Sequence, residues 1–284
     1  MVVSSATATA ANTDPVQMQT WGAHVELGPY GPVPLGASLY PEPPYRFRDA
    51  EQVMICFTAQ ADVVRPLLPP GLRLADEPAR CELRLCKYDW SAFGPYLETY
   101  LIVRVLDHRD DSYWYLPLIF TDNEAPMAAG REVWGYPKKL AQLRWSWTPR
   151  GTGGPVDDRL HFSVERPAGL TLLSATFAPE RPAEPRERKG HPVLSLRYLP
   201  PSQAGRRPAA CELITVASPK MLLTDAGGAP RLWEGRGSFT VLGRSDSDPW
   251  HLFEPIEITS AYWQVSDFSL PAGSLLHDYL RDQP

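Results

Sequence analysis

A net charge of −5 over 284 residues argues against a nucleic-acid-binding protein, because such proteins usually present a basic face. The composition, with 43% hydrophobic and 21% charged residues, is typical of a globular protein that can bury a substantial core. No apolar run approaches the ~20 residues of a membrane helix, so we predict neither a nucleic-acid nor a membrane partner.

The N-terminal segment is small and polar, without the basic start and apolar centre of a signal peptide. We interpret residues 1–20 as a disordered leader and residues 21–284 as a single domain, and we expect a cytoplasmic location. Four cysteines without CxxC spacing indicate free thiols, and six scattered histidines form no paired motif, so no metal site is predicted. Because the chain has no glycine-rich phosphate loop or dinucleotide fingerprint, we also predict no cofactor.

Apolar and polar residues alternate with a period of two along much of the chain, which predicts β-strands. In chain order, we predict a helix at 62–68, strands at 80–88, 96–106 and 114–120, a helix at 127–133, strands at 142–147, 160–164, 170–177, 193–199, 211–216, 238–242 and 257–268, and a helix at 273–281. The 31 prolines interrupt longer helices. The pattern predicts a β-dominated α+β fold with few short helices, built as a closed or cone-shaped antiparallel β-barrel.

Two glutamates lie on the more polar side of predicted strands, Glu82 opposite Leu83 and Leu85, and Glu98 opposite Leu97 and Leu101. In a barrel large enough to hold a ligand, one side of each strand faces the cavity. The pattern alone leaves open whether the glutamates face this cavity or a solvated outer surface.

Lysine is rare in the chain, with 5 lysines against 23 arginines, yet Lys138 and Lys139 are adjacent. Arginine would supply positive charge equally well, so the pair indicates amine chemistry. A deprotonated lysine condenses with a ketone to give an iminium ion, which stabilises a neighbouring carbanion. A solvated turn at Gly135 and Pro137 is the alternative. Apolar bulk from Trp134 would lower the pKa of Lys138 by desolvation, whereas alternation along an extended strand could direct the Lys139 charge away from it.

The sequence around the lysine pair resembles the acetoacetate decarboxylase superfamily. The motifs that carry the resemblance are Asp122-Asn123-Glu124, Gly130-Arg131-Glu132 and Gly135-Tyr136-Pro137-Lys138-Lys139-Leu140, with Pro44-Tyr45 and Phe47 before them, Tyr96 between, and Cys211-Glu212-Leu213-Ile214 and Asp278-Tyr279-Leu280 after them. The resemblance implies that Lys138 is the Schiff-base lysine and that Lys139 helps to lower its pKa. It also implies that Glu82 and Glu98 are the active-site glutamates.

One position departs from the family. Where the resemblance implies an active-site arginine, shortly after Phe47, this chain has Ala50. Arg46 lies nearby in the sequence, and Trp134 is a bulky candidate for reshaping the substrate pocket. We therefore predict that Trp134, Tyr136, Tyr262 and Arg46 bind a substrate other than acetoacetate.

The resemblance implies a cofactor-independent lyase that forms a Schiff base with a small or medium oxo acid and assembles as a homo-oligomer. The favoured reaction is decarboxylation of a 3-oxo acid. The first alternative is an aldolase-dehydratase of secondary metabolism that condenses pyruvate or a similar 2-oxo acid with an aldehyde. Tyr262 would be its candidate acid, unless Tyr262 is a core aromatic. The second alternative is a non-Schiff-base cyclase or a binding protein on the same fold.

Overall fold

The computed structural model describes residues 16–20, 23–27, 37–148, 159–185 and 192–281. The chain divides into two units between Glu42 and Pro43. In the first unit, β1 (Val16–Thr20) and β2 (Ala23–Leu27) form an antiparallel pair. Only the last five residues of the predicted leader lie within the described residues, and they form β1.

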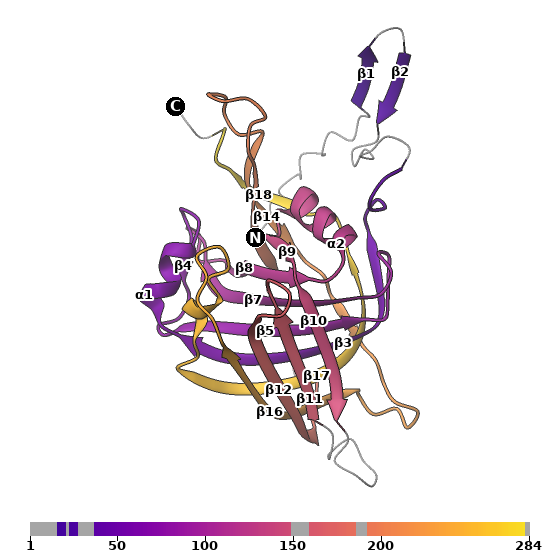
Figure 1. The fold of residues 1–284 in the computed structure, drawn as a ribbon, viewed down its shortest axis with the longest axis vertical. Helices are drawn as coiled ribbons and strands as arrows, with labels where there is room; N and C mark the ends of the chain where they lie inside the picture. The colour runs from indigo at the N-terminus through magenta and orange to yellow at the C-terminus, as the bar shows by residue number, and fades with distance from the viewer. Residues whose placement is uncertain (1–15, 21–22, 28–36, 149–158, 186–191, 282–284) are drawn as a thin grey trace, which may run out of the picture. The chain divides into compact units, whose positions relative to one another are not determined.

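The second unit is built on one large sheet, to which sixteen of the described strands belong (Figure 1). The main path runs in the order β10 (Gln142–Thr148), β11 (Arg159–Glu165), β12 (Thr171–Pro182), β16 (Leu232–Val241), β17 (Glu257–Leu270), β3 (Tyr45–Ala59), β5 (Ala79–Tyr88), β7 (Tyr96–Leu106), β8 (Ser112–Thr121), β13 (Val193–Leu199), β14 (Ala210–Val216) and β18 (Ser274–Asp278). Four short strands pair beside this path: β4 (Arg73–Leu74), β6 (Trp90–Ser91), β9 (Lys138–Leu140) and β15 (Lys220–Leu222).

The β-dominated α+β class is confirmed, but the predicted closure of the barrel is not. The described ladder ends at β10 on one side and at β18 on the other, and no pairing between these two strands joins the ends. The sheet is also mixed. β8 runs parallel to both β9 and β13, while the other described strand pairs of the sheet are antiparallel. β9 pairs with the last three residues of β8, and the helical segment 124–134 provides the crossover connection that a parallel pair requires.

Short helices occur where two of the three were predicted. α1 (Ala61–Val64) continues as a 3₁₀ turn, Arg65–Leu67, and α2 (Glu124–Ala129) continues as a π-helical turn, Gly130–Trp134. The predicted helix at 273–281 is wrong, because residues 274–278 form β18 and pair with β14. Pairing satisfies the backbone groups of β14 that would otherwise form a bare sheet edge, and this tertiary gain overrides the local pattern. Among the described helices, none has the length and hydropathy needed to cross a membrane.

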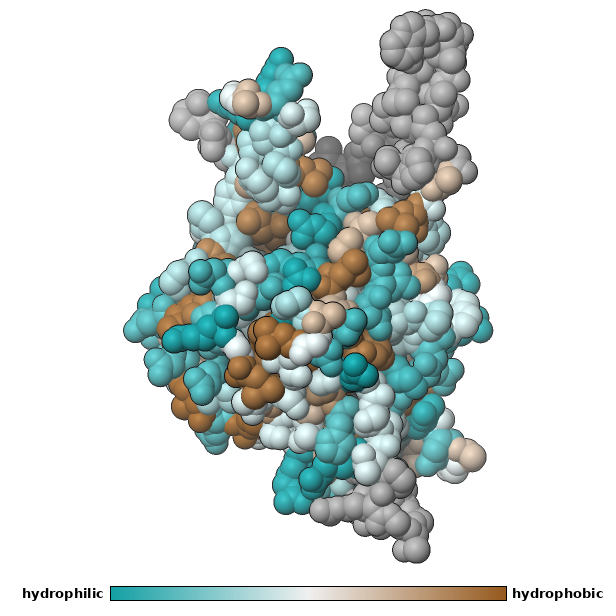
Figure 2. All heavy atoms as spheres, viewed as in Figure 1, coloured by the Kyte–Doolittle hydropathy of each residue, from teal (hydrophilic) through white to brown (hydrophobic). Residues whose placement is uncertain are grey.

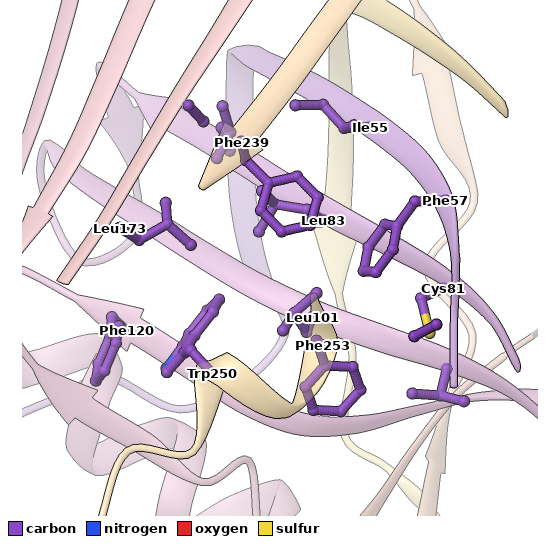
Figure 3. Close-up of a cluster of buried hydrophobic side chains, with 14 of the residues drawn as sticks. Ile55, Phe57, Cys81, Leu83, Leu101, Phe120, Leu173, Phe239, Trp250 and Phe253 are labelled. Carbon is purple, nitrogen blue, oxygen red and sulfur yellow. The ribbon is translucent and has the colours of Figure 1, made fainter. Parts of the chain in front are cut away.

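The apolar core lies against one face of the central strands (Figure 3). Ile55 on β3, Leu83 on β5 and Leu101 on β7 are at most 1% exposed. Phe120 of β8 stacks on Trp250, from the 3₁₀ turn Trp250–Phe253, with 5.0 Å between ring centroids. Burying each such side chain contributes roughly 1.5–3 kcal/mol, so this face supplies much of the stability of the second unit.

The opposite face of the same strands is polar but also buried. Alternation places on this polar face the side chains of Gln52, Glu82, Arg84, Cys86, Glu98 and Tyr100. Register aligns them in rows, since Gln52 pairs with Cys86 and Cys86 with Glu98. Gln52 is 1%, Glu82 3% and Glu98 6% exposed. A protein buries such groups only when they are paired, so the polar face is a candidate for function.

Elsewhere the surface is mixed. On the face seen in Figure 2, hydrophobic residues are interspersed with hydrophilic ones. Large exposed apolar side chains include Leu140 on β9, Leu170 in the connection between β11 and β12, and Leu242 just after β16. Single apolar residues of this kind are normal on a folded protein, so we look to the buried polar face for the site.

Candidate active site

The segment that carries Lys138 is held by local turns and by contacts with β13. Asn123 caps α2, since its side chain accepts a hydrogen bond of 2.9 Å from the backbone N–H of Ala125. The π-helical turn ends at Gly135, which has a positive φ of 75° and lies so close to β13 that a Cβ atom would overlap the backbone of Arg197. Ser195 donates a hydrogen bond of 2.6 Å to the Trp134 carbonyl. These contacts fix where the chain enters β9, and π-helical turns are often found at functional sites.

Lys138 lies on the polar face and is 5% exposed. It pairs in register with Ile119 of β8. Its Nζ donates to Oε2 of Glu98, and the two side chains are 6% and 8% exposed. The ammonium also lies over the ring of Tyr96, 5.7 Å from the centroid. Lys138 and Glu98 therefore form a buried ion pair. The roles that the sequence predicts for them, a Schiff-base lysine and a proton carrier, stay predictions.

The stem of Lys138 lies against Gly130. A Cβ atom at Gly130 would be 2.7 Å from Cδ and 2.9 Å from Cε of Lys138. Carbon atoms in contact are normally ~3.5–4.0 Å apart, so only glycine leaves the lysine side chain its observed path. The Gly-Arg-Glu motif thus has a physical role at the lysine.

Glu82 lies on the polar face next to Arg84. Oε2 of Glu82 accepts a hydrogen bond of 2.9 Å from Nε of Arg84 and a second bond from its Nη2. Burial, the largest single effect, lowers the pKa of the Arg84 guanidinium, but the charges of Glu82, Tyr100 and two cysteines together outweigh it and the pKa is raised. With only 3% of Glu82 and 6% of Glu98 exposed, the two glutamates do not lie on a solvated outer surface.

Lys139 is directed away from Lys138. Its Nζ donates to Oδ1 of Asp248 at 2.9 Å and to the carbonyl of Ser247. Oδ2 of Asp248 also accepts a hydrogen bond of 3.0 Å from Nε of Arg166. Burial raises the pKa of Asp248, but the hydrogen bonds and charges of Lys139 and Arg166 together outweigh it and the pKa is lowered. The Lys139 ammonium is therefore neutralised on the other side of β9, as alternation along an extended strand allows.

Two of the predicted substrate-binding residues lie near Lys138. Trp134 is 1% exposed and stacks on Tyr136, with 5.4 Å between ring centroids, while its indole N–H donates 3.0 Å to the carbonyl of Pro271. Burial, and then the charge of Glu98, raise the pKa of the Tyr136 phenol. Tyr136 thus lies within electrostatic reach of Glu98, and Trp134 stacks on its ring.

The other two predicted substrate-binding residues are placed differently. Arg46 is exposed, while its neighbours Tyr45 and Phe47 are buried, so its side chain leaves the sheet on the opposite side from theirs. Tyr262 lies on the polar side of β17 and is 7% exposed, but β3, β5, β7 and β8 separate β17 from β9. Tyr262 packs instead with Met54 and Leu232.

The structure adds a second lysine that the sequence interpretation missed. Lys220 of β15 donates from Nζ to Oε1 of Gln52 and lies over the ring of Phe268, 5.3 Å from its centroid. Burial, and next the charge of Arg84, lower the pKa of Lys220 to about 7. The scarcity of lysine, which singled out Lys138, applies equally to Lys220 and could have identified it. In the part of the chain that the structure describes, no cluster of three or more His, Cys, Asp or Glu residues could hold a metal ion.

Comparison with known proteins identifies the family. The family model for acetoacetate decarboxylase matches residues 29–280, which is most of the chain. The chain belongs to the acetoacetate decarboxylase family. Acetoacetate decarboxylase 2 of Mesorhizobium japonicum is 29% identical over 248 residues, which covers 87% of this chain and 89% of the relative. The predicted family membership is confirmed.

Two solved structures share the fold. The acetoacetate decarboxylase of Legionella pneumophila superposes with a TM-score of 0.73 at 24% identity, covering 86% of this chain and 91% of that one. The enduracididine biosynthesis enzyme MppR, solved with the condensation product of pyruvate and imidazole 4-carboxaldehyde, superposes with a TM-score of 0.71 at 20% identity, covering 87% and 96%. At these identities the two structures inform on the fold alone.

Proposed function

We propose that this protein is a carbon–carbon lyase in which Lys138 forms a Schiff base with a small oxo acid. The observation that carries the proposal is the buried contact between Lys138 Nζ and Glu98. A lysine must be neutral to attack a carbonyl, and here a base lies within hydrogen-bond reach of the ammonium. The related acetoacetate decarboxylases, which carry out decarboxylation, support the same class of reaction.

The first stage forms the iminium ion. Glu98 takes a proton from Lys138, and the neutral amine attacks the ketone carbon of the substrate. Glu98 then returns the proton to the hydroxyl group of the carbinolamine, which leaves as water and gives the iminium ion. Glu82 is a weaker candidate for this proton transfer, because two hydrogen bonds from Arg84 hold it as a carboxylate.

The second stage breaks the carbon–carbon bond. With a 3-oxo acid, the bond to the carboxylate breaks, carbon dioxide leaves, and the bonding electrons move into the iminium to give an enamine. Protonation of the enamine carbon and hydrolysis of the new iminium release the ketone and restore Lys138. We favour a substrate other than acetoacetate, because Ala50 stands where the family resemblance implies an arginine.

An aldolase-dehydratase is the second candidate. MppR, which shares the fold, was solved with a condensation product of pyruvate bound. In this reaction the Lys138 iminium of a 2-oxo acid loses a proton, and the resulting enamine adds to an aldehyde. Tyr262 is a weak candidate for the acid of dehydration, since four strands separate its strand from β9. The homo-oligomer and the cytoplasmic location stay predictions.

Borohydride trapping tests the proposal directly. The protein is incubated with a panel of 2-oxo and 3-oxo acids and sodium borohydride, and the reduced adduct is located by peptide mass mapping. We expect the adduct on Lys138 and its loss in Lys138→Arg, whereas Lys87→Arg, on the opposite side of β5 from Glu82, retains it. Release of carbon dioxide then identifies a decarboxylase, and a conjugated enone absorbance identifies an aldolase-dehydratase. If no oxo acid labels Lys138, the protein is instead a non-Schiff-base cyclase or a binding protein.

A further inference from the structure

Lys220 reaches the polar face from the edge of the sheet. β15 pairs with β17 so that Lys220 lies opposite Phe268. The hydrogen bond from Nζ to Gln52 ends on β3, which is the next strand beyond β17. The Lys220 side chain therefore crosses β17 and delivers an amine to the same face as Lys138.

One aromatic cluster borders both amines. Phe268, beneath Lys220, stacks on Phe47 with 4.4 Å between ring centroids and 7° between the ring planes. Phe47 meets Tyr96 edge-on at 6.4 Å, and Tyr96 lies beneath Lys138. The charges of Glu82 and Glu98 both raise the pKa of Lys220, so the second amine lies within electrostatic reach of the Lys138–Glu98 pair.

Lys220 is a cation of this face whose polar contact is an amide and not a carboxylate. Among the described residues, Arg84 is engaged by Glu82, and Lys138 by Glu98. Lys220 contacts the amide oxygen of Gln52, which also accepts a hydrogen bond of 3.3 Å from the amide N–H of Gln264. A cation held by an amide keeps the capacity to bind an anion.

A second observation also indicates a missing ligand. Ser266 lies on β17 two residues before Phe268 and pairs with Ala50 and with Leu222 of β15. It is 0% exposed, and its hydroxyl has no hydrogen-bond partner among the described residues. A buried hydroxyl is costly to leave unpaired, and a carboxylate oxygen beside Lys220 would accept its proton.

We propose that Lys220, with Ser266, binds a carboxylate of the oxo-acid substrate that the reaction leaves in place. This inference rests on the proposed Schiff-base function of Lys138. A positive charge held against a carboxylate opposes its departure as carbon dioxide, because that interaction is lost in the transition state. In a decarboxylation the bound group is therefore a second carboxylate, so the substrate is an oxo diacid. In an aldol addition it is the carboxylate of the 2-oxo acid itself.

The site also predicts a pH dependence. Lys220 is an exposed residue that a ligand can reach, while desolvation of its ammonium, followed by the charge of Arg84, lowers its pKa to about 7. The charged and titratable groups that face it are Glu82, Arg84 and Cys86 on β5 and Glu98 on β7. Burial raises the pKa of Cys86 to about 11, so that thiol does not titrate near pH 7. Only the ammonium binds the anion, so carboxylate affinity falls about tenfold between pH 6 and pH 8.

Calorimetric titration with butanoate and with the neutral butanamide tests this site without any Schiff base. We expect wild type to prefer butanoate, Lys220→Met to lose at least about tenfold in butanoate affinity, and Ser266→Ala to lose less. Lys220→Arg should retain binding but lose the decline between pH 6 and pH 8, because a guanidinium stays charged. Lys87→Met, which removes a lysine from the other side of β5, should bind as wild type does.

Kinetics connect the site to the reaction. Lys220→Met should raise the KM for 3-oxohexanedioate about tenfold or more with a smaller change in kcat. Lys138 of this variant should still be trapped by acetone, which has no carboxylate for Lys220 to bind. The proposal is overturned if wild type does not prefer butanoate to butanamide, or if Lys220→Met binds butanoate normally. Failure of acetone and of all oxo acids to label Lys138 in wild type would instead remove the Schiff-base function, while the butanoate result still decides the anion site.

Discussion

Replacing Gly130 by alanine should disable Lys138 without unfolding the protein. The backbone at Gly130 is helical, with φ −58° and ψ −46°, so an alanine fits the local conformation. Its Cβ would be 2.7 Å from Cδ and 2.9 Å from Cε of Lys138. Restoring a contact of ~3.5 Å or more requires the lysine stem to move by about 1 Å, which breaks the hydrogen bond from Nζ to Glu98.

The expected loss follows from this displacement. A reacting group misplaced by ~1 Å typically costs about 10²-fold in rate. Stability should change little, because the clashing atoms belong to a flexible side chain and alanine is favoured over glycine in a helix by roughly 0.5–1 kcal/mol. The measurement is the rate of borohydride trapping with acetone, together with urea unfolding of the same variant.

Gly135→Ala is the matched control at the other end of the π-helical turn. There the added Cβ would overlap the backbone of Arg197, and the positive φ of 75° disfavours any side chain. This variant should lose both stability and trapping. A Gly130→Ala protein that traps acetone at the wild-type rate would refute the placement of Lys138 against the end of α2.

Three further perturbations test the buried charges. Glu98→Gln removes the base in contact with Lys138 and should slow iminium formation by about 10²–10⁴-fold at pH 7, measured by the same trapping assay; an unchanged rate would assign the proton transfer to another group. Arg84→Met leaves Glu82 buried without its cation and should cost about 3–5 kcal/mol in urea unfolding, whereas the double variant Arg84→Met/Glu82→Leu should recover most of this; equal losses in both would contradict the pairing. Lys139→Met should cost about 0.2–1 kcal/mol at pH 7, since Arg166 still binds Asp248. The pKa of Asp248 is lower in the folded protein, so the stability that it contributes is present above the unfolded pKa of ~3.9 and is lost as pH falls through the folded pKa. The free energies of unfolding of wild type and Lys139→Met should therefore converge in acid. A difference between them that widens in acid would exclude this linkage.

The sequence predicted best where one face of a strand is apolar and the other polar. The strands at 80–88 and 96–106 were predicted almost to the residue, and their alternation put Glu82 and Glu98 on the face opposite the core. The strand predicted at 238–242 is longer and begins at Leu232. β3 gives no period-two signal over residues 52–57, because both of its faces are buried there.

The remaining errors concern contacts between distant segments. Whether a sheet closes depends on its first and last strands, β10 and β18, and no local pattern contains that information. Apolar and polar residues alternate too weakly in the C-terminal segment to predict a strand that pairs with β14. β15 has three residues, which is too few for a period, so Lys220 could only be found by its residue type.

Lys138 and Lys220 differ in the groups that they contact on the polar face of the sheet. A face that holds Glu82, Arg84, Glu98 and Lys138 out of water is stable only because each charge meets an opposite one, and register brings these partners together. Lys220 enters from the edge and meets an amide instead, and burial of its ammonium, followed by the charge of Arg84, lowers its pKa to about 7. A bound carboxylate would supply what the protein does not, and would raise that pKa as it binds. Because no carboxylate among the described residues contacts Lys220, this lysine is suited to bind an anionic substrate. Lys138, whose ammonium contacts the base Glu98, is the amine suited to react.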